Sequence, residues 1–271
     1  MRLLIFSTEF PPGPGGIGTH AWQLARNMHR LGWQVRVLTL QDYAAKGEIE
    51  TFNHQQPFPV QTLEHQRLPV LEGAHRWHCL RRLENDWQPD VLVATGEQAV
   101  LIAAAMKRNI PRVAIWHGVI PPKGWQQNLY RRAYQRADQI VAVSHYSYSQ
   151  LVAMGIQPRR GLVITNGADA DQFMPISDKR TKEFRQEIGV PFQPLLLTVG
   201  NISERKGQDI VIRAMPTILK EYPEVHYIIV GLPTSQEELT KLARALGVAN
   251  RVHFLGKVAQ ESLPTIYNAC D

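Results

Sequence analysis

Short apolar runs alternate with amphipathic runs along almost the whole chain. The apolar runs are rich in valine, isoleucine and leucine, as buried strands are, and the runs between them have apolar residues every three or four positions, as helices do. This alternation predicts stacked β-α-β units and parallel sheets. The predicted strands are residues 3–7, 34–40, 91–94, 112–116, 139–143, 162–165, 195–199, 227–230 and 252–255.

The helical runs have recognisable ends. Residues 19–31 place an apolar stripe from Ala21 to Leu31 on one face, which we interpret as core packing, and Gly32 ends the run. Ser144 is a suitable N-cap for a helix that Gly155 ends. The other predicted helices are residues 98–108, 126–137, 179–188 and 208–220, and runs that begin at Gln236 and Gln260.

A proline-rich segment divides the pattern. Pro175, a charged helical run, Pro191 and Pro194 precede a new apolar strand, so we predict one domain over residues 1–190 and a second over 191–271. The second has only three predicted strands, whereas sheets have about five or six. We therefore expect an α/β protein with two Rossmann-type domains, the second of them incomplete.

The net charge of +6 belongs to the first domain. Residues 1–190 contain 22 Lys and Arg against 16 Asp and Glu, and residues 191–271 contain eight of each. Residues 75–82 and 130–136 mix cations with aromatic residues on predicted helices. Such a face suits an anionic membrane or nucleic acid, and its alternative is an ordinary solvated face with the aromatic residues in the core. We expect contact with an anionic membrane surface and not with nucleic acid.

Cysteine and hydropathy exclude several classes of protein. Cys79 and Cys270 are too few for a disulfide scaffold, and no cysteine or histidine spacing predicts structural zinc. No apolar stretch approaches the roughly 18 to 20 residues of a membrane span, and the chain starts directly with a strand pattern. We expect a cytoplasmic protein, with contact at the inner face of the cytoplasmic membrane if the basic face is used.

Two glycine loops connect a strand to a helix, at residues 11–18 and 200–207. A helix N-terminus preceded by small residues exposes free backbone N–H groups and a partial positive charge, which suit an anion. The second loop also contains Arg205 and Lys206. Phosphate is therefore the expected ligand of the second loop.

The first loop has an alternative interpretation. Gly13, Gly15 and Gly18 match the G-x-G-x-x-G spacing of dinucleotide-binding proteins, and Asp42 stands near the expected ribose-binding acid. Against this, residues 9–12 separate the strand from the glycines. An NAD-dependent oxidoreductase is therefore the weaker of the two hypotheses.

A set of short motifs, in order along the whole chain, resembles the family-4 glycosyltransferases with the GT-B fold. The motifs are residues 6–12, 15–20, Trp116-His117-Gly118, Val143-Ser144, Asn166-Gly167-Ala168-Asp169 with Phe173, Val199-Gly200, Arg205-Lys206-Gly207, Val230-Gly231 and residues 251–256. The resemblance implies transfer of a sugar, with retention, from a nucleotide-sugar donor to an acceptor such as a lipid-linked or polysaccharide precursor. It implies no metal and no cofactor.

The resemblance also assigns roles. Arg205 and Lys206 would stabilise the charge on the leaving diphosphate, and His117 would contact the donor sugar. Gly15 and Gly16 would let the first loop approach the phosphates or the acceptor. The expected donor-binding residues are Gly15, Gly16, Gly200, Asn201, Arg205, Lys206 and Gly231, and the expected acceptor-side residues are Gly16, Thr19, His20 and Asn166.

Two departures from the family pattern affect the donor site. Asn201 stands where many members have arginine, which would weaken donor binding roughly tenfold to a hundredfold unless Arg205 compensates. The two-glutamate motif of the family would follow Asp271, so we expect the chain alone to be weakly active or inactive. A non-catalytic lipid- or glycan-binding module remains an alternative. We expect variable loops at residues 43–74 and 120–127 to recognise the acceptor.

Overall fold

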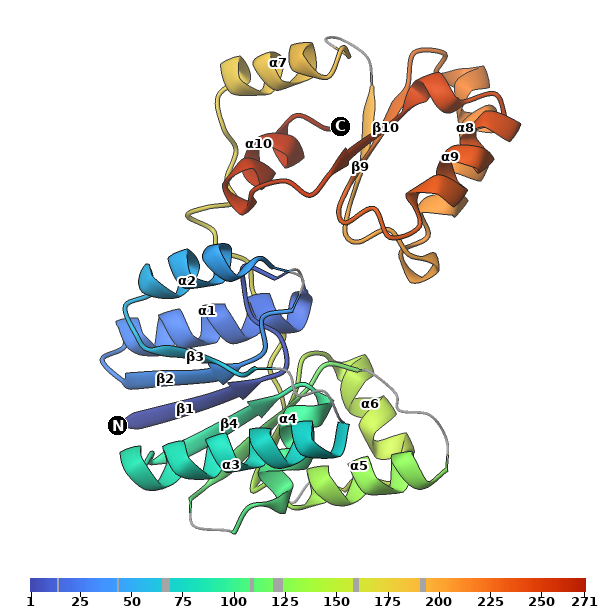
Figure 1. Ribbon diagram of the computed structural model, residues 1–271. Helices are drawn as coiled ribbons and strands as arrows, with labels where there is room; N and C mark the ends of the chain where they lie inside the picture. The colour runs from blue at the N-terminus through green and yellow to red at the C-terminus, as the bar shows by residue number, and fades with distance from the viewer. Residues whose placement is uncertain are drawn as a thin grey trace. The chain divides into compact units, whose positions relative to one another are not determined.

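The computed structural model describes residues 1–13, 15–42, 44–64, 69–107, 110–118, 124–157, 161–190 and 194–271. These residues form two compact units, Met1–Gly167 and Ala168–Asp271, shown in blue to green and in yellow to red in Figure 1. Each unit has one parallel sheet with helices, which confirms the predicted α/β class.

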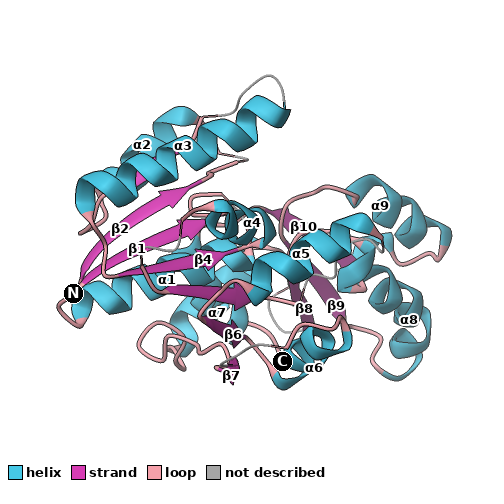
Figure 2. Ribbon diagram, turned by 90° about the horizontal axis from the view of Figure 1, so that it is seen from below, coloured by secondary structure: helices cyan, strands magenta, loops and turns pink. Residues whose placement is uncertain are grey.

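The first unit contains a seven-stranded sheet in the order β3-β2-β1-β4-β5-β6-β7 (Figure 2). All its strand pairs are parallel. The strands are β1 Arg2–Ser7, β2 Gln34–Thr39, β3 Val60–Thr62, β4 Val91–Thr95, β5 Arg112–Trp116, β6 Gln139–Ala142 and β7 Gly161–Val163. The helices are α1 Gly16–Arg30, α2 Lys46–His54, α3 Pro69–Trp87, α4 Glu97–Ala105, α5 Trp125–Gln135 and α6 His145–Ala153.

Helices cover both faces of this sheet. Alternate residues of β1 enter different cores: Leu4 and Phe6 pack with residues of α3 to α6, whereas Leu3 and Ile5 pack with residues of α1 and α2. Successive side chains of a strand point to opposite faces, so a strand buried on both faces has to be apolar throughout. The continuous apolar runs of the sequence follow from this burial.

The predicted helix cap at Ser144 is confirmed, and the predicted apolar stripe of the first helix is confirmed in part. Ser144 caps α6, because its Oγ accepts the Ser147 N–H at 3.0 Å. The predicted stripe of the first helix is buried at Ala21 and Ala25, but Leu31 is 74% exposed and lies beyond the end of α1. The stripe therefore ends before Leu31.

The prediction of a variable loop over residues 43–74 was wrong for the described part of that range. It contains α2, β3 and the first residues of α3, while residues 43 and 65–68 lie outside the described residues. The short strand β3 has no buried residue, and neither has α2, so neither has a strong apolar period. In the other predicted loop, residues 120–123 lie outside the described residues, and α5 begins at Trp125.

The second unit has a three-stranded parallel sheet in the order β10-β9-β8. Its strands are β8 Leu195–Val199, β9 His226–Val230 and β10 Val252–Gly256. Its helices are α7 Asp178–Glu187, α8 Gln208–Glu221, α9 Gln236–Ala245 and α10 Leu263–Asn268, with single 3-10 turns at Glu204–Lys206, Ala249–Arg251 and Gln260–Ser262. The three predicted strands of this unit are confirmed.

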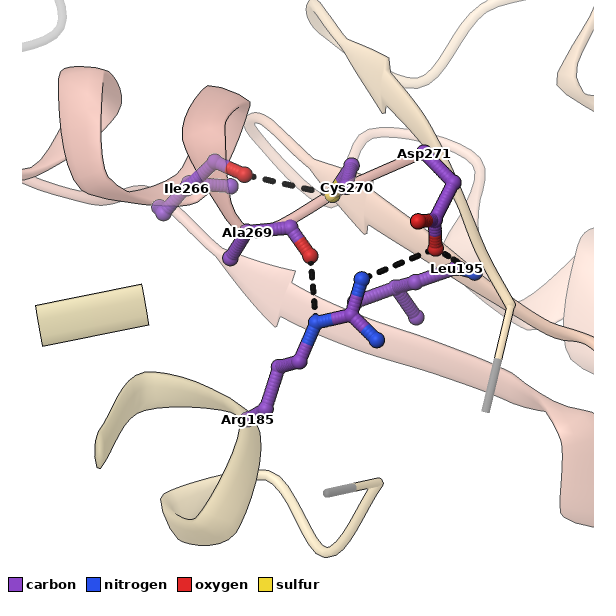
Figure 3. A network of polar contacts seen from close by, with 6 residues as sticks. All are labelled: Arg185, Leu195, Ile266, Ala269, Cys270 and Asp271. Carbon is purple, nitrogen blue, oxygen red and sulfur yellow. Dashed lines mark hydrogen bonds and ion pairs between the residues drawn. The ribbon is translucent and has the colours of Figure 1, made fainter. Parts of the chain in front are cut away.

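The units divide earlier than the boundary predicted at residue 190, because α7 packs with the second unit. Arg185 of α7 donates from Nε to the Ala269 carbonyl at 2.7 Å and pairs with Asp271 Oδ2 at 2.8 Å (Figure 3). The same carboxylate oxygen accepts the Leu195 N–H at 2.9 Å. A single carboxylate thus connects α7 with the start of β8.

A histidine pair lies at the amino end of the second sheet. His226 Nδ1 is 2.7 Å from His253 Nε2, and Arg251 Nη1 lies 2.8 Å from His226 Nε2. Since arginine can only donate, His226 Nε2 accepts and its Nδ1 carries the proton. Burial is the main cause that lowers the pKa of both histidines.

Candidate functional site

The strand order of the first sheet reverses between β1 and β4, and open α/β sheets bind ligands outside the carboxyl ends of the strands at such a point. The chain is closely packed there. The Thr8 N–H donates to the Thr95 carbonyl at 3.1 Å, and a Cβ on Gly96 would lie only 1.9 Å from Thr8 Oγ1. The residues that follow β1 and β4 therefore form the first part of the candidate site.

The first glycine loop leads from β1 into α1. The helix begins at Gly16 and not at the predicted Thr19, and its N-cap, Gly15, has no side chain to accept a hydrogen bond. A Cβ on Gly18 would lie 2.9 Å from the Phe10 nitrogen, so the helix start packs directly on the preceding backbone. A Cβ on Gly16 would meet nothing within 4 Å, so this residue faces open space. Pro14 lies outside the described residues.

His117 and His20 come together at this edge. His117 follows β5, and its Nε2 lies 2.8 Å from Thr95 Oγ1. The ring of His20, on the first turns of α1, meets the His117 ring edge to face with centroids 5.1 Å apart. Burial, reinforced by His20, lowers the pKa of His117 to about 4, and burial also lowers the pKa of His20.

A neutral His117 limits the chemistry of the site. The Thr95 hydroxyl can donate or accept, so one imidazole nitrogen is engaged and the other remains available for a ligand. At neutral pH such a ring forms hydrogen bonds with hydroxyl groups but supplies no positive charge. This arrangement suits an uncharged, hydroxyl-bearing ligand such as a sugar.

Two of the expected acceptor-side residues are not brought into this group. The Thr19 hydroxyl donates to the Gly15 carbonyl at 3.0 Å, which engages its hydrogen within α1. Asn166 is exposed and follows β7, which is separated from β5 by β6. These two residues stay predictions.

Two carboxyl groups near the first loop were missed by sequence reasoning. Burial is the main cause that raises the pKa of Glu9, which follows β1, and of Glu97, the first residue of α4. Among the described residues, Glu9 Oε2 is buried and has no hydrogen-bond partner. The only sequence signal was the position of each residue two places after the end of a strand, where glutamate is unremarkable.

The second glycine loop follows β8. Gly200 and Gly231 cross so closely that a Cβ on Gly231 would lie 2.0 Å from the Gly200 carbonyl oxygen. The Gly200 N–H donates to the Val230 carbonyl at 2.8 Å, and the Ile202 N–H to the Leu232 carbonyl at 3.0 Å. The loop is therefore held against the end of β9 by backbone contacts that permit no side chain on Gly231.

Both cations of this loop are exposed. Arg205 and Lys206 lie in the 3-10 turn before α8, and Gly207 joins the turn to the helix in the left-handed conformation, with φ 69°. A Cβ on Gly200 would lie 3.6 Å from Lys206 Nζ, so the ammonium group folds back over the glycine. Asn201 is exposed beside it. The structure thus brings Gly200, Asn201, Lys206 and Gly231 into one loop cluster.

Gln208 supports this loop and was also missed. Its side chain is 1% exposed, and its Nε2 donates to the Asn201 carbonyl at 3.3 Å and to the Gly200 carbonyl at 3.5 Å. Its Oε1 accepts the Ser203 N–H at 3.5 Å. A polar residue at a helix start predicts a solvated position, and only the fold shows that it lies beneath the loop.

The described residues contain no group of three or more His, Cys, Asp and Glu side chains that could hold a metal ion. None of their helices combines the length and the apolar character needed to cross a membrane.

Comparison with protein families gave matches to both units. Residues 14–172 match the model described as Glycosyltransferase Family 4, and residues 180–271 match the model described as Glycosyl transferases group 1. The chain is 28% identical over 279 residues to a GDP-mannose-dependent alpha-(1-6)-phosphatidylinositol monomannoside mannosyltransferase of Mycobacterium tuberculosis. That match covers 100% of this chain and 71% of the relative.

Solved structures show the same architecture. Anabaena HepE in complex with UDP-glucose is 25% identical, with a TM-score of 0.80 over 100% of this chain and 72% of HepE. Sucrose-phosphate synthase of Thermosynechococcus elongatus has a TM-score of 0.81 over 100% of this chain and 74% of that chain, and at 16% identity it shows the fold alone. The expected GT-B fold is confirmed, and the matches favour a glycosyltransferase over the dinucleotide-binding alternative.

Proposed function

This chain belongs to glycosyltransferase family 4, and we propose that it transfers a sugar, with retention of the anomeric configuration, from a nucleotide-sugar donor to a glycan or lipid-linked acceptor. The observation that supports this proposal best is the second glycine loop. It combines two exposed cations, Arg205 and Lys206, with backbone at Gly200 and Gly231 that has no side chain to keep a ligand away. HepE, whose structure contains UDP-glucose, has this fold.

The leaving group explains why cations are needed at this loop. As the bond between the sugar and the diphosphate breaks, negative charge grows on the diphosphate oxygens. Lys206, Arg205 and the N-terminus of α8 would stabilise that charge more in the transition state than in the bound donor. In this proposal they supply the positive charge without a metal ion.

In the same proposal His117 binds the donor sugar. Its imidazole is uncharged at neutral pH, because its pKa is about 4, and one ring nitrogen is engaged with Thr95. The other imidazole nitrogen would form a hydrogen bond with a sugar hydroxyl and so orient the sugar for transfer. Gly15 and Gly16 would place backbone N–H groups near the substrate.

Calorimetric titration tests the donor site. UDP, GDP and ADP are titrated into the chain and into Lys206→Ala. Lys220→Ala is the matched control, because Lys220 is an exposed lysine in the last turn of α8, away from the loop that precedes this helix. A hydrogen bond to a charged group contributes about 1.5 to 3 kcal/mol, so Lys206→Ala should weaken binding roughly tenfold to a hundredfold. Lys220→Ala should bind as the unmodified chain does.

Each outcome identifies a function. Binding that only Lys206→Ala weakens supports the donor site and names the nucleobase. Binding to none of the three nucleotides contradicts a donor site formed by this chain alone and favours a glycan- or lipid-binding module. Retention is tested separately, because the anomeric proton of the transferred sugar has a coupling constant that distinguishes the two anomers in the NMR spectrum of the product.

For the acceptor, we propose a lipid-linked glycan presented at an anionic membrane. The name of the mycobacterial relative gives a phosphatidylinositol monomannoside as its acceptor. On α3 of this chain, Arg81 stacks over the Trp77 ring at 5.1 Å from its centroid, and Arg82 is exposed beside it. These residues line a cavity of about 370 Å³. Arg76 is different, because it is buried and paired with Glu72.

Vesicle binding tests this acceptor class. Each cation near an anionic surface contributes on the order of 1 kcal/mol, so replacing Arg81, Arg82, Arg131 and Arg132 by Gln should reduce co-sedimentation with phosphatidylglycerol vesicles by at least tenfold. Vesicles of phosphatidylcholine serve as the neutral control. Equal co-sedimentation of the two proteins with phosphatidylglycerol would remove the membrane from the proposal.

A further inference from the structure

The two residues that flank His117 are both held by α6. Trp116, the last residue of β5, is buried, and its indole Nε1 donates to the Ser147 carbonyl at 2.8 Å. The indole ring also meets the Tyr134 ring edge to face, with centroids 5.2 Å apart. One hydrogen bond and one ring contact therefore fix the residue that precedes His117.

Gly118, which follows His117, packs on the same turn of α6. Its φ of 86° lies in the left-handed region, which favours glycine. A Cβ on Gly118 would lie 3.0 Å from Ser147 Oγ and 3.3 Å from Gln150 Oε1. These two atoms occupy the space that a larger residue would need, so the backbone after His117 lies directly against α6.

Ser147 is itself fixed within α6. It is 5% exposed, its N–H donates to Ser144 Oγ at 3.0 Å, and the two hydroxyl oxygens lie 2.9 Å apart. Ser144 is the N-cap of the helix. The Ser147 hydroxyl therefore has a partner that holds it beside Gly118, while the Ser147 carbonyl bonds Trp116.

The contact of Gly118 with Gln150 is unfavourable for stability. Gln150 Oε1 is buried, and this oxygen has no hydrogen-bond partner among the described residues. A buried acceptor without a partner destabilises the folded chain, because it has lost its hydrogen bonds to water. Arrangements that lower stability in this way are expected at functional sites. The packing of Gly118 on α6 is therefore better explained by the histidine beside it than by stability.

The His117 imidazole is directed by the backbone on which it stands. Its Nε2 lies 2.8 Å from Thr95 Oγ1, and its ring meets the His20 ring edge to face. A hydrogen bond weakens steeply when donor and acceptor are misaligned, so the other ring nitrogen can bind a hydroxyl only while the ring keeps its orientation. Fixing the residues on both sides of His117 keeps that orientation.

We propose that Ser147 is a positioning residue for substrate binding by His117: it holds the backbone on both sides of the histidine, so that one ring nitrogen stays at Thr95 and the other stays available for a sugar hydroxyl. The proposal rests on the transferase function proposed above and adds a residue to it. In this proposal Ser147 contacts no substrate and acts only through Trp116 and Gly118.

Substitutions at three positions test these contacts. Ser147→Ala removes the hydroxyl beside Gly118, and Trp116→Phe removes the N–H that bonds the Ser147 carbonyl. Gly118→Ala places a methyl group against the Ser147 hydroxyl, and adding Ser147→Ala relieves that contact while the strain of the left-handed backbone remains. Ser149→Ala is the control, because Ser149 is an exposed serine of the same helix.

The state of the His117 ring is measured by NMR on protein with isotope-labelled histidine, and His117→Gln identifies its signals. The unmodified chain should show one tautomer of His117 and a pKa of about 4. In Ser147→Ala and in Trp116→Phe both tautomers should appear, and the pKa should rise by at least about half a unit, a roughly threefold change in proton affinity. Ser149→Ala should titrate as the unmodified chain does. Gly118→Ala should shift this pKa more than the double variant does.

An unchanged His117 titration in Ser147→Ala would overturn the proposal. So would equal shifts in Gly118→Ala and in the double variant, because Ser147 would then not act through Gly118. Unfolding of the first unit is measured by tryptophan emission in urea. A lower urea midpoint in Ser147→Ala with an unshifted His117 pKa would assign Ser147 to the fold alone.

Calorimetric titration links Ser147 to the substrate. UDP-glucose and GDP-mannose are each compared with their own nucleotide, UDP or GDP. Ser147→Ala should weaken binding of the nucleotide sugars by up to about tenfold and leave the nucleotides unchanged, because His117 would contact the sugar alone. Equal affinity of Ser147→Ala and the unmodified chain for the nucleotide sugars contradicts positioning. If neither a nucleotide nor a nucleotide sugar binds the unmodified chain, the transferase function fails, while the His117 titrations still decide whether Ser147 fixes the ring.

Discussion

Replacing Gly231 by alanine should destabilise the second unit more than the same change at any open glycine. Gly231 has φ 152° and its added Cβ would lie 2.0 Å from the Gly200 carbonyl oxygen and 2.4 Å from the Gly200 carbonyl carbon. Both neighbours are backbone atoms of Gly200, whose N–H donates a hydrogen bond to the Val230 carbonyl, so neither atom moves freely. The loop would have to leave the end of β9.

The magnitude follows from two contributions. A residue with a Cβ in a left-handed conformation costs about 1–2 kcal/mol, and overpacking costs about 1–3 kcal/mol. Together they give about 2–5 kcal/mol, a large share of the roughly 5–15 kcal/mol that stabilises a typical protein. Gly247→Ala is the matched control, because Gly247 has φ 71° and its Cβ would meet nothing within 4 Å. The control contains only the first contribution.

The assay uses the distribution of tryptophan. All six tryptophans precede residue 168 and lie in the first unit, so their emission in urea reports that unit alone. Hydrogen exchange of peptides from β8, β9 and α8 reports the second unit. Gly231→Ala should lower the opening free energy of these peptides by about 1–3 kcal/mol more than Gly247→Ala does, with unchanged tryptophan emission. Equal effects of the two variants would refute the close approach of Gly200 and Gly231.

Three further predictions concern single side chains. Because the pKa values of His226 and His253 are lowered in the folded chain, the unfolded chain takes up protons more readily. The second unit should therefore be stable above the ordinary histidine pKa of 6.5 and lose stability as the pH falls below it. Replacing both histidines by Gln should make this stability, measured by hydrogen exchange, less dependent on pH. The ring protons of His117 should titrate in the NMR spectrum with a pKa of about 4, and a midpoint near 6.5 would contradict its burial. Gln208→Leu removes the hydrogen-bond partner of the Gly200 and Asn201 carbonyls and of the Ser203 N–H. It should therefore speed amide exchange in residues 200–203 by a factor that corresponds to about 1–3 kcal/mol and weaken nucleotide binding; slow exchange there would exclude a supporting role for Gln208.

Local sequence patterns determined the fold class, most helices and every described strand except β3. Strands such as Arg112–Trp116 and Leu195–Val199 were predicted with their observed bounds, because four of the five residues in each are apolar. The glycine loops were visible for a similar reason, since left-handed backbone and close approach favour glycine. Elements without a buried face, such as α2, left no such pattern.

Only the tertiary structure decided which residues meet at the candidate site. His20 and His117 are far apart in the sequence, and the parallel order of β1, β4 and β5 brings their rings to 5.1 Å. Glu9 and Gln208 are ordinary polar residues in the sequence, and only the fold shows that Glu9 Oε2 and the Gln208 side chain are buried beside a glycine loop. Sequence determines backbone preference and apolar period, which are local, whereas burial and the pKa of His117 depend on neighbours that the fold supplies.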